Sequence, residues 1–239
     1  MSTWDQIQDW WRSLFPPVEE PVPTPGLRPR VLLITFNPTI AAEGGKKLTQ
    51  VLGWRDVEEL CAGYIADLRE CSKGYVDYQI VERIEADEWP AKEDGFRYDE
   101  DSFLGSWRRK SGFHSPDTAD YDALIDEFDL VKRVEADLID EVWMFAFPYA
   151  GFYESRMVGD GSLSINAPPL EDGCGRRYIV MGFNPERGLG SMLHDMGHML
   201  ESYFSYAFRG WQPVDGPLGD DPYALFRRWR SGFDPNNPT

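Results

Sequence analysis

The segment Arg30-Val31-Leu32-Leu33-Ile34-Thr35-Phe36 decides the fold. A nearly unbroken apolar run of this length, ended here by Asn37-Pro38, is typical of a β-strand that is buried on both faces. Strands of that kind belong to parallel sheets covered by helices on both sides. We therefore predict a buried strand over residues 30–36.

Further segments on either side alternate between strand and helix patterns. Two more apolar runs predict buried strands, and an alternating run predicts a strand that is one-faced or near an edge. Apolar residues at helical spacing predict long helices between them. The buried strands are expected over 142–147 and 176–183, the alternating strand over 75–86, and the helices over 56–72, 120–140 and 189–208. This alternation predicts an α/β fold, a three-layer structure with a mostly parallel sheet and helices on both faces.

The ends of the chain differ from this central region. Apolar residues at helical spacing predict a short helix over residues 1–15, and six prolines follow within 16–29. We expect residues 1–29 to form an N-terminal helix and a Pro-rich linker, and 30–239 to form one α/β domain with a further short helix over 222–229. The first helix either packs back on the domain or docks a partner.

One internal stretch, residues 89–118, shows neither the alternation of a strand nor the spacing of a helix. Because it is longer than most structureless connections, it is either partly ordered or functional, for example as a lid.

Composition limits the classes of partner. The chain carries 41 acidic and 24 basic residues, a formal net charge of -17. Phosphate-backbone binding needs Lys and Arg, so nucleic acid is not an expected partner. The excess acid indicates a solvated surface, or otherwise a cationic ligand or bound metal. No apolar stretch is long enough for a transmembrane segment, and the chain as given is expected to be cytoplasmic, or secreted if a leader is missing.

Parallel α/β sheets bind their ligands beyond the carboxyl ends of their strands. Here those ends lead into the loops 36–39, 147–156 and 183–188, which carry acidic, basic and amide side chains. Paired carboxylates on separate loops can act as general acid and base, although loop salt bridges are the simpler interpretation. The candidate catalytic residues are Glu154, Glu186 and Arg187, and the candidate substrate-binding residues are Asn37, Tyr153, Arg156 and Asn184.

The last predicted helix carries the strongest pattern. His194, His198 and Glu201 fall within about 60° on one face, where two imidazoles at i and i+4 can bind a divalent ion such as zinc. The pattern only loosely resembles the zinc-protease motif, because Asp195 stands where the motif has Glu. His114 is the remaining histidine of the chain. The simpler interpretation is an amphipathic helix with a hydrogen bond between His198 and Glu201.

The other side of this helix is apolar and is expected to pack on the sheet. It carries Met192, Met196, Met199 and Tyr203.

Several short motifs are similar to those of a family of uncharacterised bacterial proteins, often secreted and modular, to which no activity is attached. They cover most of residues 30–208 and read Glu154-Ser155-Arg156-Met157, Met181-Gly182-Phe183-Asn184, Glu186-Arg187-Gly188 and Gly197-His198 with Glu201. The resemblance implies that one site contains Glu154, Asn184, Arg187, His198 and Glu201. It also implies that His194 is peculiar to this sequence, which weakens the His194/His198 pair, and it speaks against the cytoplasmic expectation.

Three functions remain open from the sequence. The leading expectation is a metal-dependent hydrolase, peptidase- or amidase-like, with His194, His198 and Glu201 as metal ligands. A metal-free hydrolase, such as a glycosidase with paired glutamates, is the first alternative. The second is a non-catalytic module that binds a sugar or peptide through aromatic residues of the lid and rim, namely Trp89, Tyr98, Trp107, Phe152 and Tyr153.

Overall fold

The computed structural model describes residues 26–207. The expected helices over 1–15 and 222–229, and most of the Pro-rich linker, lie outside these residues. The described strands are β1 (Arg30–Phe36), β2 (Thr39–Ile40), β3 (Lys46–Lys47), β4 (Gln79–Ala86), β5 (Glu141–Phe145), β6 (Ser155–Val158) and β7 (Tyr178–Phe183). The described helices are the 3-10 turn Ala41–Glu43 and α2 (Leu48–Leu52), α3 (Val57–Cys71), α4 (Glu100–Arg109), α5 (Tyr121–Glu127), α6 (Leu130–Glu135) and α7 (Leu189–Ala207).

Five strands form the main sheet in the order β4-β1-β5-β7-β6. β1 pairs in parallel with β4 and β5, and β5 pairs in parallel with β7, whereas β6 is antiparallel to β7. From β1 the chain crosses first to β4 on one side and then to β5 on the other. The order of the strands therefore reverses beside β1, which is where such sheets open a crevice at their carboxyl edge.

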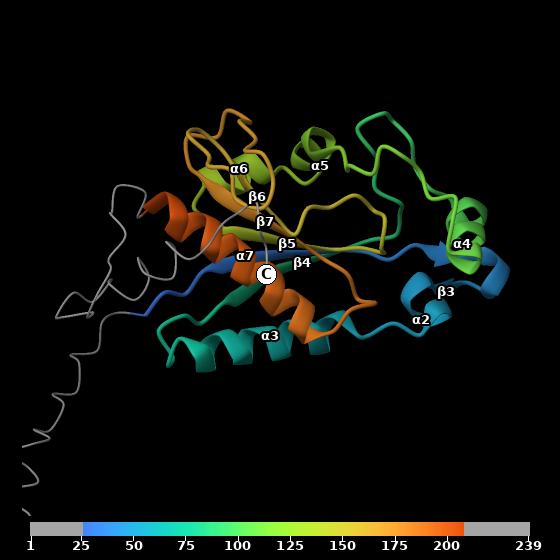
Figure 1. Ribbon diagram of the computed structural model, residues 1–239, viewed down its shortest axis with the longest axis horizontal. Helices are drawn as coiled ribbons and strands as arrows, with labels where there is room; N and C mark the ends of the chain where they lie inside the picture. The colour runs from blue at the N-terminus through green and yellow to red at the C-terminus, as the bar shows by residue number, and fades with distance from the viewer. Residues whose placement is uncertain (1–25, 208–239) are drawn as a thin grey trace, which may run out of the picture.

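Helices cover both faces of the sheet, which confirms the predicted α/β architecture. Figure 1 shows α3 and α7 on one side of the strands and α5 and α6 on the other. Alternate residues of β1 enter two separate cores: Val31 and Leu33 pack with α3 and α7, while Leu32 and Ile34 pack with α5 and α6. This is why residues 31–34 are all apolar.

The edge strand β4 confirms the expectation of an alternating, partly exposed strand. It begins at Gln79 rather than at Tyr75, because Val76 makes only an isolated bridge to Leu27 before the ladder starts.

Two expectations about local structure were wrong, those for 120–140 and for Arg156, whereas the stretch 89–118 is partly ordered, as one of its two expected alternatives. The region 120–140 is two short helices, because Asp129 has a left-handed φ of 50° that breaks the helix. The region 89–118 is partly ordered and contains α4, which begins at an Asp99 side chain that accepts a hydrogen bond from the Ser102 amide. Arg156, placed in a rim loop by the sequence, lies in strand β6.

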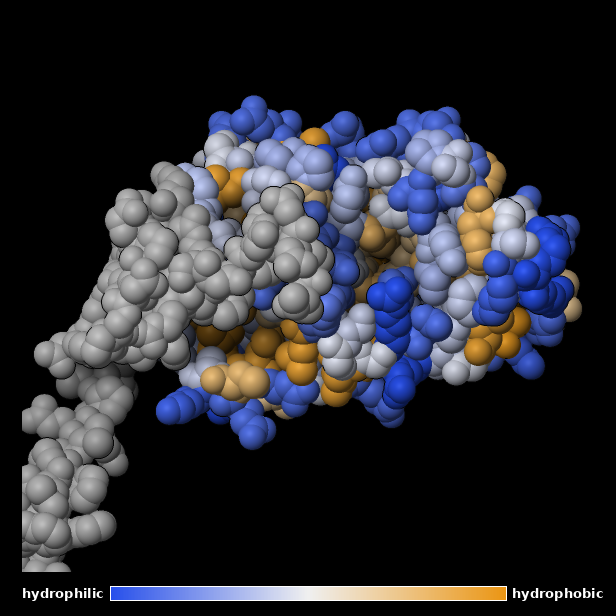
Figure 2. Space-filling view, in the orientation of Figure 1, coloured by the Kyte–Doolittle hydropathy of each residue, from blue (hydrophilic) through white to orange (hydrophobic). Residues whose placement is uncertain are grey.

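The surface agrees with the acidic composition. Figure 2 shows mainly hydrophilic residues on this face of the molecule. Within residues 26–207, no helix combines the length and apolarity needed to cross a membrane.

Candidate active site

A cleft of about 430 Å³ lies at the carboxyl edge of the sheet, beside the ends of β5 and β7. Its walls come from the α4 region, from the loop after β5 and from the loop between β7 and α7. They are formed by Trp107, Lys110, Phe113, Asp117, Pro148, Tyr149, Asn184, Glu186 and Arg187. Of the residues predicted from the sequence, Asn184, Glu186 and Arg187 therefore share one cleft.

The loop after β5 is held in an unusual conformation at this cleft. Tyr149 has a φ of 68°, a left-handed value that is rare for an aromatic residue, and its ring stacks on Phe113 with centroids 3.6 Å apart. The Lys92 side chain is 1 % exposed, and its ammonium donates to the Tyr149 carbonyl at 2.8 Å and to Asp117 at 2.5 Å. A buried lysine, paired with an Asp117 side chain that is 40 % exposed, thus fixes one wall of the cleft.

Close packing reinforces the same loop. A Cβ atom added to Gly151 would lie 2.6 Å from the Ala119 amide nitrogen and 3.1 Å from the Lys92 ammonium. Only glycine fits there, so the chain passes close to the ion pair.

Asp195 is the second element of the site. It lies on the sheet-facing side of α7, on the same stripe as the buried Met192, Met196 and Met199, and is 5 % exposed. Its Oδ1 has no hydrogen-bond partner among the described residues. Burial of a carboxyl without a donor disfavours its charged form. The pKa of Asp195 is accordingly raised to about 7, first by burial and then by the charge of Glu154.

Two cationic groups act in the opposite direction. The charges of Arg187 and His198 lower the pKa of Asp195, although less than burial raises it. Glu154, Arg187 and His198 therefore all lie within electrostatic range of one carboxyl group. The structure brings these three predicted residues together around Asp195, and Arg187 also lines the cleft.

Glu154 is positioned by the antiparallel strand β6. Its carbonyl accepts a hydrogen bond from the Gly182 amide at 3.2 Å, and its Oε2 accepts one from the Asn166 side chain at 2.8 Å. A Cβ at Gly182 would lie 2.4 Å from the Tyr153 carbonyl oxygen, so this approach requires glycine. The half-buried carboxylate of Glu154 is thus fixed at the end of the sheet.

Ser155 follows Glu154 and lies on the same face of the sheet as α7. It pairs with Met181, and directly paired residues of a sheet point to the same face; Met181 packs in the core beneath α7. The Ser155 hydroxyl is fully buried and, like Asp195 Oδ1, lacks a hydrogen-bond partner within the described residues. The buried Tyr64 hydroxyl in the same core also lacks a partner among the described residues, so three unpaired polar groups are buried on this side of the sheet.

The predicted metal ligands lie on the exposed side of α7. His194, His198 and Glu201 are all exposed, and His198 Nδ1 lies 3.2 Å from Glu201 Oε2. The two imidazole rings meet edge to face with centroids 4.3 Å apart. Within residues 26–207, no group of three or more His, Cys, Asp or Glu side chains is arranged to hold a metal ion.

Arg156 and Tyr153 lie on the other face of the sheet. The Arg156 guanidinium lies 4.7 Å from the centre of the Tyr121 ring on α5, and its Nε donates to the Pro168 carbonyl. The Tyr153 amide donates to the Tyr121 hydroxyl. These side chains stabilise the packing of α5 and do not face Asp195.

Asn37 and His114 also lie apart from the Asp195 group. The Asn37 side chain bonds Thr49 at the start of α2, accepting from its amide and donating to its hydroxyl, both at 3.1 Å. His114 stacks on Phe96 with centroids 3.8 Å apart, and its Nε2 lies 2.7 Å from Asp94. Both are accounted for by local structure.

Sequence reasoning named Asp195 only as the residue that replaces the glutamate of the zinc-protease motif, and it did not single out Ser155, Asn166 or Lys92. One signal for Asp195 was present: it stands three residues after Met192 and four before Met199, inside the apolar stripe of the helix. An aspartate in such a stripe is buried by its own helix. Asn166 and Lys92 lie in irregular segments, where no period marks a buried position.

No protein family, curated protein or solved structure matches the chain. The resemblance to uncharacterised bacterial proteins stays a prediction, and the function is argued from the geometry of the site.

Proposed function

We propose that this protein is a hydrolase that uses Asp195 for proton transfer and Glu154 as its neighbouring carboxylate, at the carboxyl edge of the sheet. The observation that carries the proposal is the Asp195 carboxyl, which is buried, has Oδ1 unbonded within the described residues, and has a pKa raised to about 7. A carboxyl group in that range can both donate and accept a proton at neutral pH.

The neighbouring charges suit hydrolysis. Glu154 is held by Asn166, and its charge contributes to the raised pKa of Asp195, so the two carboxyls can take different protonation states. One of them then activates water or stabilises positive charge while the other protonates the leaving group. Arg187, which faces the cleft, is placed to stabilise negative charge that develops on a substrate oxygen.

Paired carboxyls favour a metal-free hydrolase, and we place a glycoside first among its substrates, ahead of a peptide or amide. The cleft of about 430 Å³ accepts a small substrate unit, with Phe113 and Tyr149 as its aromatic wall. The carboxylates that line the cleft itself are Asp117 and Glu186, and Arg187 links it to the Asp195 group because it lines the cleft and lies within electrostatic range of Asp195.

The test is a screen of chromogenic glycosides, esters and amides with the wild-type protein and Asp195→Asn. We expect turnover of at least one class and its loss in the variant. Asp126→Asn, an exposed carboxyl on α5, serves as the matched control and should keep full turnover. If the protein binds a saccharide or peptide but turns over no class of substrate, the hydrolase proposal is wrong and a non-catalytic binding module is supported.

Metal-dependent hydrolysis is the second candidate, because two imidazoles lie next to each other on the exposed face of α7 with Glu201 beside them. As they stand, His198 is paired with Glu201, so a divalent ion such as zinc would have to break that pair and draw the three donors together. Metal analysis of the purified protein tests this candidate. Stoichiometric zinc that is lost in His198→Ala would support it, and absence of metal after reconstitution would exclude it.

A further inference from the structure

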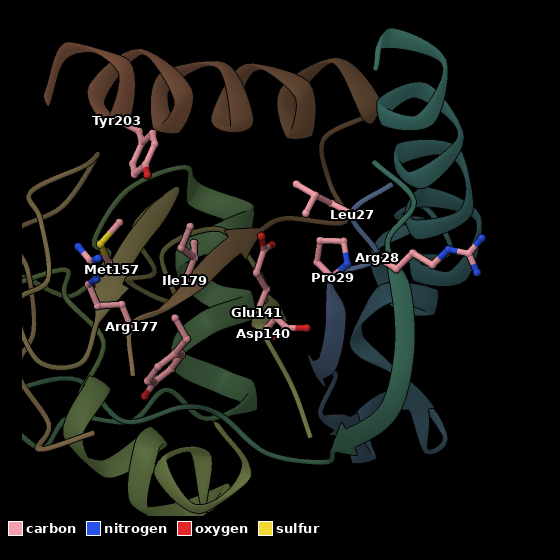
Figure 3. A pocket seen from close by; sticks show the side chains of 10 residues that line it. Leu27, Arg28, Pro29, Asp140, Glu141, Met157, Arg177, Ile179 and Tyr203 are labelled. Atoms are coloured by element: carbon pink, nitrogen blue, oxygen red, sulfur yellow. The ribbon is translucent and has the colours of Figure 1, made fainter. Parts of the chain in front are cut away.

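A second cavity, of about 440 Å³, lies at the amino edge of the sheet, opposite the proposed active site. It opens between the starts of β1, β5 and β7 on one side and the last turns of α7 on the other (Figure 3). Much of its wall is apolar and is formed by Leu27, Pro29, Met157, Ile179 and Tyr203. Nothing in the proposed hydrolase mechanism uses this cavity.

Glu141 lies inside this apolar wall. It is the first residue of β5, is 8 % exposed, and points in Figure 3 toward α7, between Ile179 and Leu27. Its Oε1 accepts a hydrogen bond from the Tyr78 hydroxyl at 2.8 Å, and its Oε2 accepts one from Trp143 Nε1 at 3.2 Å. A carboxylate can accept about four hydrogen bonds, so each oxygen retains an acceptor site for a ligand.

The other charged residues of the wall do not neutralise Glu141. Asp140 is already paired with Arg30 at 2.9 Å and with Arg176. Arg28 and Arg177 are exposed, and the Arg28 guanidinium points away from the cavity in Figure 3. Among the described residues that line the cavity, Glu141 is the buried charged group.

A buried carboxylate in an apolar wall favours ligands of one charge. Burial penalises its ionised form, while the donors Tyr78 and Trp143 favour that form, so the pKa of Glu141 is raised to about 7. A ligand that brings a positive charge next to Glu141 would remove most of this penalty. A neutral ligand of the same shape would leave it in place.

We propose that the cavity at the amino edge binds a small primary amine with an apolar body, the ammonium on Glu141 and the body against Met157, Ile179 and Tyr203. The net charge of -17 raises the local concentration of such cations around the protein. This ligand site is separate from the Asp195 site, so failure of either proposal leaves the other intact.

Benzylamine and its neutral counterpart benzyl alcohol are the probes, titrated into the full chain carrying 13C-methyl methionine. We expect benzylamine to shift the Met157 methyl signal in a saturable way and to bind at least about tenfold more tightly than benzyl alcohol, a difference of about 1.4 kcal/mol. Glu141→Gln should abolish this preference. Glu135→Gln, an exposed glutamate on α6, should preserve it.

Two results would overturn the proposal. Equal binding of both probes to the wild-type protein would show an apolar cavity without charge recognition, and binding of neither would show that this cavity takes no such ligand in the full chain. If Glu141→Gln does not fold, Tyr203→Ala removes part of the apolar wall and leaves both hydrogen bonds of Glu141 in place. It should weaken benzylamine severalfold, and an unchanged affinity would contradict the proposed position of the ligand.

Discussion

The two edges of the sheet each bury one carboxyl group, and the two groups differ in what they bond. Asp195 at the carboxyl edge and Glu141 at the amino edge both have a pKa raised to about 7, with burial as the main cause. Both oxygens of Glu141 accept hydrogen bonds from the protein, whereas Asp195 Oδ1 accepts none from residues 26–207. Burial alone therefore does not distinguish the two sites. A carboxylate held by two donors is suited to bind a charge, and one that lacks a donor is suited to exchange a proton.

The largest expected effect is on turnover, where substitution of Asp195 and substitution of Glu141 should give different results. With a substrate found in the screen, Asp195→Asn should lower kcat by about 10²- to 10⁴-fold, the usual contribution of a general acid or base. Glu141→Gln should leave kcat within about twofold, because it lies at the opposite edge. Steady-state kinetics on both folded variants measure this difference, and equal losses would remove the functional distinction between the two edges.

The second largest effect is on stability, because the ion pairs at the two edges should contribute differently to the free energy of unfolding. Lys92→Met removes a buried ammonium from the Tyr149 carbonyl and from Asp117, which is 40 % exposed. It should lower the free energy of unfolding by about 2 kcal/mol, mainly because the carbonyl loses its donor. Arg30→Met breaks the pairs with Asp137 and Asp140 at the amino edge, where the side chains are 31 %, 72 % and 25 % exposed, and should cost about 1 kcal/mol.

Urea denaturation gives both values. A smaller loss for Lys92→Met than for Arg30→Met would show that the buried Lys92 does not hold the wall of the cleft. Lys92→Arg, which keeps the charge but not the shape, is the matched control and should lose less than Lys92→Met.

A smaller difference between the two carboxyl variants is expected in how the free energy of unfolding changes with pH. Because Asp195 and Glu141 hold their protons more tightly when folded than when unfolded, stability should fall as pH rises from about 4 to about 7. Asp195→Asn removes a buried charge without donors on one oxygen, and should raise stability at pH 8 by about 1–2 kcal/mol relative to wild type. Glu141→Gln should gain less, since it also weakens the bonds from Tyr78 and Trp143.

Thermal unfolding between pH 4 and pH 8 tests this prediction. Each variant should show a shallower fall in stability than the wild-type protein. Parallel curves for Asp195→Asn and wild type would mean that Asp195 does not titrate in this range.

The architecture was largely predictable because its main elements carry strong periods. Residues 31–34 are all apolar because β1 contributes side chains to two cores. The stripe Met192, Met196 and Met199 correctly places the buried side of α7, whereas Tyr203, expected on the same side, is 46 % exposed. Strand β6 was not predictable in this way, because four residues are too few to establish an alternating pattern. The break at Asp129 depends on one left-handed residue inside an otherwise helical pattern.

The candidate site was predictable only in part. Strand ends and a helix face pointed to Glu154, Arg187 and His198, and all three lie within electrostatic range of Asp195. The relation among them depends on β6 running antiparallel beside β7 and on Asn166 reaching back to Glu154, neither of which has a local signature. Tyr153 and Arg156 show the same limit, because the alternation of β6 turns Arg156 to the opposite face.

The central claim is that Asp195 is a carboxyl group poised for proton transfer beside Glu154, and it can be measured without a substrate. The carboxyl carbon of Asp195, assigned with the Asp195→Asn variant, can be followed by 13C NMR from pH 3 to pH 9. The account predicts a midpoint near 7 that falls when Glu154→Gln removes the neighbouring charge. A midpoint near the ordinary value of 3.8, unchanged by Glu154→Gln, would contradict it.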